Sequence, residues 1–300
     1  MASDVDQKQI TVFGHRGARG IYPENTMAGF QYLHDIGVTA VEVDVQNAAG
    51  RLTVLAHDPH VSIADGELDS IQTQLVLDTT TKQLPLLKVG GLRPGSTDFM
   101  LFPDQARLPH EQVPTFDTFC RWAVDHTPML LNIEIKSHGM RSDLYDAPDV
   151  IISDVVNLLE YHDLAQRCVI SSFDWRVLEA CAKRAPDIPR GHLTLEQSHG
   201  TTMEPNVIDG SPWLNGVSRA DHGGTLPQTV AGLGGKVWNP FFKDLNRESL
   251  AIAQNLGLLV NVWTVNDQDD INQMIDMGVN GIISDYPARV QNVLALRNAR

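Results

Sequence analysis

Charged side chains in three apolar segments of this chain have the types and spacing of a metal and phosphate site. Glu42 and Asp44 lie two residues apart, as do Glu134 and Lys136, so each pair shares one face of a strand. Burying an unpaired carboxylate costs several kcal/mol or forces it to take up a proton. If both faces point into one pocket, a divalent cation between the three carboxylates would relieve their repulsion.

Two cationic side chains accompany these carboxylates. Arg16 follows His15 in a His-Arg-Gly segment, and Lys136 shares the face of Glu134. With a divalent cation bound and no substrate present, the local charge of the site is near zero. At a coordination position left open on the cation the charge is positive, which favours an anionic substrate. The alternative is an internal salt-bridge cluster, but two cations do not balance three anions. Carboxylate ligands favour Mg²⁺ or Ca²⁺, with Mn²⁺ as a third candidate, over zinc.

Composition excludes several classes of partner. The 300 residues are 42% hydrophobic, and 37 acidic against 23 basic side chains give a formal charge of -14. Such a surface repels nucleic acid and anionic lipid headgroups, so neither is an expected partner. The cysteines lack metal-site or disulfide spacing and are expected to be buried, reduced thiols; they are Cys120, Cys168 and Cys181.

The location predicted from the sequence is the cytoplasm, without stable membrane insertion. The first residues have neither a basic nor an apolar region of a secretory signal, and no apolar run reaches the roughly 18 residues that span a bilayer. A leader removed from the chain is the alternative to a cytoplasmic location. The oligomeric state is not predicted.

Apolar strands alternate with helical segments, which predicts an α/β fold. The expected strands lie near 10–14, 40–45, 130–135, 168–171, 189–194, 236–239, 258–264 and 280–283. Eight strands over this length favour a TIM (β/α)8 barrel. The expected helices lie near 25–36, 115–126, 148–162, 174–184, 246–256 and 268–277, with a last helix after Pro287.

Two parts of the chain depart from this alternation. The apolar run 52–56 follows the second strand too closely for a crossover helix, so we interpret it as a hairpin limb that returns His57 and Asp58 toward Glu42 and Asp44. Residues 59–113 are predicted to be a small insertion on the catalytic rim of a single domain, 1–300. The stretch 197–235 is expected to form another wall or lid, or a disordered loop.

A specific set of motifs resembles the glycerophosphodiester phosphodiesterase family. They are GHRGARGIYPENT (14–26), VEVDVQ (41–46), LAHDP (55–59) and NIEIKS (132–137), in this order, and the likeness continues through RPGS, FPDQ, VPTFDTF, SSFDWRVL, NVWTVND and GVNGIISDYP. The segment after His57-Asp58 differs from the usual pattern of the family. The catalytic motifs are intact.

The resemblance implies a TIM-barrel enzyme that hydrolyses small-molecule glycerophosphodiesters to sn-glycerol 3-phosphate and an alcohol with a divalent cation. It implies Glu42, Asp44 and Glu134 as metal ligands, His15 and His57 as the acid/base pair, and Arg16 and Lys136 as phosphate contacts. Trp263, near the end of a strand, is expected either to wall the glycerol pocket or to pack in the core. Asn25 and Glu24, at the start of a helix, are expected either to serve its capping or to support the site.

Three alternatives stay open on the reaction. Attack by the substrate's own hydroxyl would give a cyclic phosphate that water then opens, whereas water could also attack phosphorus directly. The substrate could be a lysophospholipid, which would make the enzyme a lysophospholipase D and would require an exposed apolar groove at the rim. The barrel could instead be a catalytically inactive binding module, although such a module would be expected to lose a histidine or a carboxylate.

Overall fold

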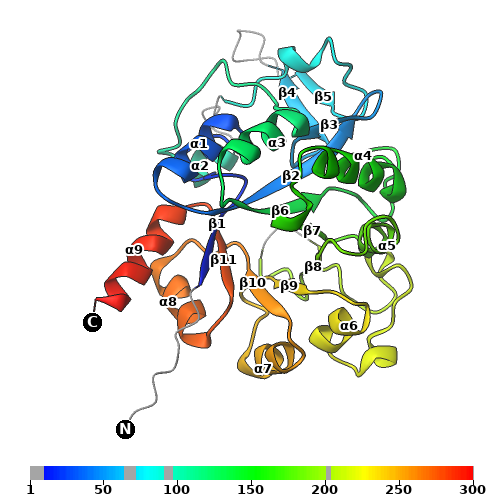
Figure 1. Ribbon diagram of the computed structural model, residues 1–300, viewed down its shortest axis with the longest axis vertical. Coiled ribbons are helices and arrows are strands. Elements are labelled where there is room, and N and C mark those ends of the chain that lie inside the picture. Colours follow the sequence, from blue (N-terminus) through cyan, green and yellow to red (C-terminus); the bar gives the residue numbers. More distant parts are fainter. Residues whose placement is uncertain (1–9, 64–71, 91–96, 201–203, 300) are drawn as a thin grey trace.

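Parallel strands form a closed barrel in this protein. The computed structural model describes residues 10–63, 72–90, 97–200 and 204–299. The barrel strands are β1 (Thr11–Gly14), β2 (Ala40–Ala48), β6 (Leu130–Ile135), β7 (Cys168–Ser172), β8 (Arg190–Thr194), β9 (Val237–Pro240), β10 (Leu259–Val262) and β11 (Gly281–Ser284). Each pairs in parallel with its neighbours in chain order, and the pairings β1–β11 and β1–β2 close the sheet (Figure 1). The predicted TIM barrel is confirmed.

Strand β2 extends beyond the barrel, which is why it outruns the predicted segment 40–45. Its parallel pairing with β6 ends where Val45 lies opposite Ile135. From Val45 to Ala48 it pairs antiparallel with β3 (Leu52–Leu55) instead. The predicted hairpin limb is therefore confirmed, and the chain after β3 returns to the rim at the carboxyl ends of the strands.

Helices cover the outside of the barrel (Figure 1). The first begins one residue after Thr26, whose hydroxyl accepts the backbone N–H of Gly29, rather than at residue 25 as the sequence predicts. The helices around the barrel are α1 (Met27–Asp35), α3 (Phe116–Asp125), α4 (Pro148–Tyr161), α5 (Trp175–Arg184), α6 (Leu226–Gly232), α7 (Arg247–Asn255), α8 (Gln268–Met277) and α9 (Pro287–Asn298).

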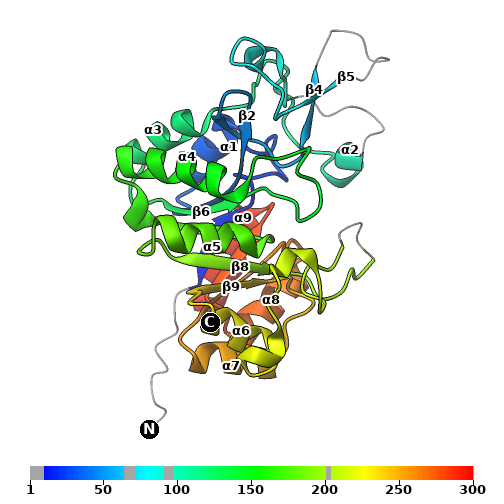
Figure 2. The same cartoon turned by 90° about the vertical axis from the view of Figure 1, so that its right-hand side faces the viewer.

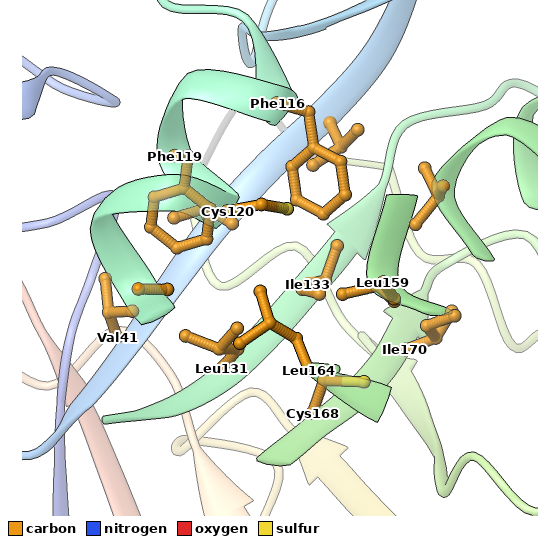
Figure 3. Packing of buried hydrophobic residues seen from close by; sticks show 14 of the residues in the cluster. Val41, Phe116, Phe119, Cys120, Leu131, Ile133, Leu159, Leu164, Cys168 and Ile170 are labelled. Carbon is orange, nitrogen blue, oxygen red and sulfur yellow. The ribbon is translucent and has the colours of Figure 1, made fainter. Parts of the chain in front are cut away.

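Apolar side chains between sheet and helices form the core. Phe116, Phe119 and Cys120 of α3 lie over Leu131 and Ile133 of β6 (Figure 3). Their burial explains the near-continuous apolar character of the parallel strands. The cysteines are free and buried, as predicted, and burial raises the pKa of each thiol.

The predicted insertion holds short elements above the barrel (Figure 2). They are β4 (His60–Ile63), β5 (Gln72–Leu75), the 3-10 turn η1 (Leu84–Leu86) and α2 (Thr97–Leu101), and β4 pairs antiparallel with β5. Residues 64–71 and 91–96, which include the Arg-Pro-Gly-Ser motif, lie outside the described residues.

The stretch 197–235 contains a crossover helix that the sequence pattern missed. Helix α6 begins after Thr225, whose hydroxyl accepts the backbone N–H of Gln228, and Pro227 occupies its first turn. Two 3-10 turns precede it, η3 (Pro212–Leu214) and η4 (Arg219–His222). The described part of the stretch is thus ordered into short elements, and 201–203 lie outside it. In the described part of the chain, no helix has the length and apolar character needed to cross a membrane.

Candidate active site

Three carboxylates converge at the carboxyl end of the barrel. Register places Asp44 of β2 directly opposite Glu134 of β6, and Glu42 lies two residues earlier on the same face. One oxygen from each of the three carboxylates lies within 4.8 Å of the others. Glu42 Oε1 and Asp44 Oδ1 are buried without a hydrogen-bond donor among the described residues. Buried oxygens without donors, in an all-carboxylate set, fit a hard divalent cation.

The two predicted cations border these carboxylates. Lys136 Nζ lies 2.6 Å from Glu134 Oε1 and 3.6 Å from Asp44 Oδ1. Arg16 Nε lies 3.2 Å from Asp44 Oδ2, and its backbone N–H donates to Glu42 Oε2 at 2.9 Å. These contacts include the salt bridges of the alternative interpretation, but they leave two carboxylate oxygens without donors. The ion pairs alone therefore do not account for the cluster.

The pKa values of the paired carboxylates move in opposite directions. Burial, then the charges of Asp44 and Glu134, raises the pKa of Glu42 well above its usual range. Burial acts in the same direction on Asp44, but Arg16, His57 and Lys136 outweigh it and lower the pKa of Asp44. An added cation would remove the repulsion that disfavours the ionised form of Glu42.

His15 lies beside the carboxylate cluster. Its Nδ1 is 2.6 Å from Asp285 Oδ1, and its Nε2 is 3.9 Å from Glu42 Oε2. Burial lowers the pKa of His15, although the charge of Asp285 partly opposes this effect. Asp285 also accepts from Asn266 Nδ2 at 2.6 Å, which fixes its carboxylate. The imidazole is thus held with Nε2 toward the carboxylates.

His57 reaches the same rim from the chain segment after β3. Its Nδ1 is 2.7 Å from Asp58 Oδ1. Gln46 lies in phase with Glu42 and Asp44 along β2, and its Nε2 donates to the carbonyls of Ala56 and Asp58 at 2.9 Å each. The extension of β2 therefore anchors the segment that carries this histidine, and each of the two imidazoles has a carboxylate on Nδ1.

An aromatic group lies at the carboxyl ends of other barrel strands, where Trp263 is a buried member of the core. Trp263 packs edge-on against Phe173 at 5.3 Å between ring centroids and tilted against Phe241 at 5.1 Å. Its indole N–H donates to the carbonyl of Asn239 at 2.8 Å, so only the ring remains for other contacts. Trp238 is instead a buried core residue whose N–H donates to Thr194 Oγ1.

Sequence reasoning missed one residue of the site and left two undecided. Asp285 was missed, although its Ser-Asp-Tyr-Pro segment ends the last strand, where barrel sites lie. Glu24 was left between helix capping and support of the site, and its Oε2 lies 2.7 Å from Arg16 Nη1 and 2.8 Å from Arg19 Nε. The cap of α1 is Thr26, so Asn25 is free to bond Asp44: Nδ2 donates to Oδ2 at 2.9 Å.

Comparisons with known proteins give one family and one fold for this chain. A sequence model of the glycerophosphoryl diester phosphodiesterase family matches residues 15–289. The crystal structure of a protein from Silicibacter pomeroyi DSS-3, provisionally described as a glycerophosphoryl diester phosphodiesterase, superposes with a TM-score of 0.82. It is 32% identical, and the match covers 97% of this chain and 94% of that chain.

Two further proteins are similar over nearly the whole chain. A glycerophosphodiester phosphodiesterase from Caldanaerobacter subterraneus is 26% identical over 285 residues, which are 94% of this chain and 97% of the relative. A phosphodiesterase from Oleispira antarctica, crystallised with its product sn-glycerol-3-phosphate, superposes with a TM-score of 0.69 at 21% identity. That match covers 95% of this chain and 96% of the other, and it extends the likeness in fold.

Proposed function

Since this chain belongs to the glycerophosphoryl diester phosphodiesterase family, we propose that it hydrolyses glycerophosphodiesters to sn-glycerol 3-phosphate and an alcohol, with a divalent cation. The observation that carries this proposal is the convergence of Glu42, Asp44 and Glu134 within 4.8 Å, bordered by His15 and Lys136. The small-molecule substrate is an anion, and the cationic side chains at the cluster match its charge.

Glu42, Asp44 and Glu134 would hold the cation, which we expect to be Mg²⁺ or Ca²⁺, with Mn²⁺ also compatible with oxygen ligands. When bound, the cation would neutralise charge on the phosphoryl oxygens. Arg16 and Lys136 supply further positive charge on the same side of the site. Both stay protonated, because the neighbouring carboxylates raise their pKa values more than burial lowers them. These groups lower the repulsion that a phosphodiester anion presents to a nucleophile.

His15 and His57 are proposed as the acid/base pair. Imidazole exchanges protons near neutral pH, and each Nδ1 is already held by a carboxylate, which leaves Nε2 for the reacting oxygens. One histidine would take the proton of the attacking oxygen while the other protonates the leaving alcohol. The attacking oxygen is either the glycerol hydroxyl beside the phosphate, which gives a cyclic phosphate first, or water.

The ring of Trp263 is proposed as a wall for the apolar face of the glycerol group. Its N–H is occupied by Asn239, so the contact would be made by the ring. The ring packs against Phe173 and Phe241 in a preformed aromatic group, which would limit the cost of ordering it on binding.

Lysophospholipase D activity is a second candidate, favoured by apolar side chains on the insertion. Met100 and Leu101 of α2 are 70% and 58% exposed. An acyl chain would be a suitable partner for such side chains at the rim. They are two residues on one short helix, so glycerophosphodiesters without an acyl chain remain the first candidate.

The test is a panel assay of product release, in which sn-glycerol 3-phosphate marks cleavage of a glycerophosphodiester without an acyl chain and lysophosphatidic acid marks cleavage of a lysophospholipid. The protein is treated with EDTA, and Mg²⁺, Ca²⁺ or Mn²⁺ is added back with glycerophosphodiesters of different alcohols, or with lysophospholipids. We expect hydrolysis of the glycerophosphodiesters to disappear with EDTA and to return with a cation. Release of lysophosphatidic acid from lysophospholipids, without cleavage of the other diesters, would favour the second candidate. Full activity after thorough chelation would contradict the role of the cation.

A further inference from the structure

Asp174 is a buried carboxylate that the proposed reaction does not use. It lies in the SSFDWRVL motif, one residue before α5, and its side chain is 0% exposed. As the N-cap of α5 it accepts the backbone N–H of Arg176 at 3.1 Å. Serine, threonine or asparagine would cap the helix as well. Capping alone therefore does not explain why a charged group is buried here.

The remaining bonds of this carboxylate lead to the segment after β6. Arg176 donates from Nε to Asp174 Oδ1 at 2.9 Å and from Nη2 to Oδ2 at 2.6 Å. Ser137, the residue after Lys136, donates from Oγ to Oδ2 at 2.8 Å. Arg176 Nη2 also donates to the carbonyl of His138 at 3.1 Å. A buried carboxylate bonded at both oxygens thus links α5 rigidly to the chain that follows Lys136.

The same part of the chain bonds the residue before Lys136. Ser172 Oγ donates to the carbonyl of Ile135 at 2.8 Å and accepts the backbone N–H of Asp174 at 3.1 Å. The backbone N–H of Lys136 donates to the carbonyl of Val45 in β2 at 2.9 Å. The backbone of Lys136 is therefore held from β2 and, on both sides along the chain, from the connection between β7 and α5. We call the bonds from this connection the clamp.

The side chain of Lys136 reaches into the site, away from the clamp. Its Nζ lies 2.6 Å from Glu134 Oε1 and 3.6 Å from Asp44 Oδ1, whereas the next residue, Ser137, bonds toward α5. Neighbouring side chains of an extended segment point in this way to opposite sides. A lysine has a flexible four-carbon stem, and a phosphoryl group would compete with the two carboxylates for its ammonium. The clamped backbone then sets where Nζ can reach.

We propose that Asp174 is a positioning residue for Lys136: through Ser137, and together with Ser172, it fixes the backbone from which the ammonium meets the phosphoryl group of the substrate. This inference rests on the proposed function and adds to it a residue that acts without touching the substrate. It also gives the SSFDWRVL motif a role at the site, which is to hold the end of the NIEIKS motif.

The first test is Ser137→Ala, which removes one bond of the clamp but leaves the cap of α5 and the pair with Arg176 in place. A displacement of a binding group by about 1 Å can cost up to about 100-fold in rate. We therefore expect kcat/KM to fall by about 10-fold to 100-fold, measured with the diester that the wild type cleaves best. Ser137→Thr keeps the hydroxyl and should restore the wild-type value. Ser153→Ala, at a half-buried serine of α4, is the matched control and should leave kcat/KM unchanged.

A double-mutant cycle shows whether the clamp acts through Lys136. Lys136→Met removes the ammonium, so in that background Ser137→Ala should change kcat/KM by less than about 2-fold. Asp174→Ser keeps a cap for α5 but withdraws the carboxylate from Ser137, and it should depend on Lys136 in the same way. A loop that was merely loosened would lower kcat/KM by the same factor in both backgrounds. That result, or an unchanged kcat/KM in Ser137→Ala, would overturn the proposal.

Crystal structures of the wild type and of Ser137→Ala give a measurement that needs no turnover. We expect Lys136 Nζ to be displaced or disordered in the variant, with its contact to Glu134 Oε1 lost. An Nζ that does not move would overturn the proposal. A wild-type protein that cleaves no diester would overturn the proposed function instead, and the two crystal structures would still decide whether the clamp positions Lys136.

Discussion

Asp285 Oδ1 lies 2.6 Å from His15 Nδ1, although the two residues are 270 positions apart in the sequence. His15 follows β1 and Asp285 follows β11, the strands whose pairing closes the barrel. A carboxylate on Nδ1 orients an imidazole and leaves Nε2 for a reacting group. Closure of the barrel thus completes the proposed acid/base group.

Asp285→Asn should impair catalysis more than stability. The amide keeps the shape of the side chain but loses the charge, so we expect kcat to fall by about 10²-fold to 10⁴-fold. The charge of Asp285 raises the pKa of His15, so its removal should lower that pKa further. The limb of the pH profile of kcat/KM that reports His15 should move to lower pH. An unchanged profile would contradict the coupling.

His15→Ala and His57→Ala should each lower kcat by about 10²-fold to 10⁴-fold, because each removes one proton-transfer group. Neither residue belongs to the carboxylate cluster, so cation affinity measured by calorimetry should survive. His34→Ala, which removes an exposed histidine on α1, is the control and should leave both values unchanged. Loss of cation binding in both active-site variants would refute the assignment.

Variants of Asn25 and Thr26 should distinguish a residue that supports the cation site from one that caps a helix. Asn25 has a positive φ of 55°, so Asn25→Gly removes the amide without straining the backbone. Loss of its bond to Asp44 should weaken cation binding by about 10-fold to 100-fold. Thr26→Ala removes the cap of α1 and should cost about 1 kcal/mol of unfolding free energy with cation affinity retained. If Asn25→Gly instead lowered the unfolding free energy in urea, and Thr26→Ala weakened cation binding in calorimetry, the two roles would be reversed.

His192 should make the protein less stable as pH falls. Burial, then the charge of Arg190, lowers the pKa of His192 from 6.5 to about 3. Below pH 6.5 the unfolded chain binds a proton that the folded chain excludes, so the free energy of unfolding falls, by about 2 kcal/mol at pH 5. The difference in unfolding free energy between the wild type and His192→Gln should therefore narrow by about 2 kcal/mol from about pH 8 to pH 5. A difference that stays constant would show that His192 titrates normally in the fold.

Much of the fold and of the site could be predicted from local sequence patterns. Glu42 and Asp44 are two residues apart, so the strand period places their side chains on one face. Pairing of neighbouring barrel strands then brings this face beside Glu134. The hairpin after β2 was predictable, because the connection is too short for a crossover. The family motifs supplied the roles expected of His15 and His57, and these roles remain proposals.

Other features depend on contacts that no local pattern encodes. Asp285 meets His15 only when the barrel closes, so the spacing between them carries no periodic signal. Asn25 was ambiguous, because short polar side chains serve both as helix caps and as ligands to nearby groups. Helix α6 was missed because it is short and lies in a stretch rich in glycine and proline.

A single cation held by all three carboxylates is the central claim, and anomalous diffraction from crystals grown with Mn²⁺ tests it most directly. We predict one strong anomalous peak with an oxygen of Glu42, Asp44 and Glu134 each at about 2.0 to 2.6 Å. The matched variant Glu134→Gln should weaken or abolish the peak. A wild-type map without a peak at this place, or with a peak bound only by residues elsewhere, would contradict the account.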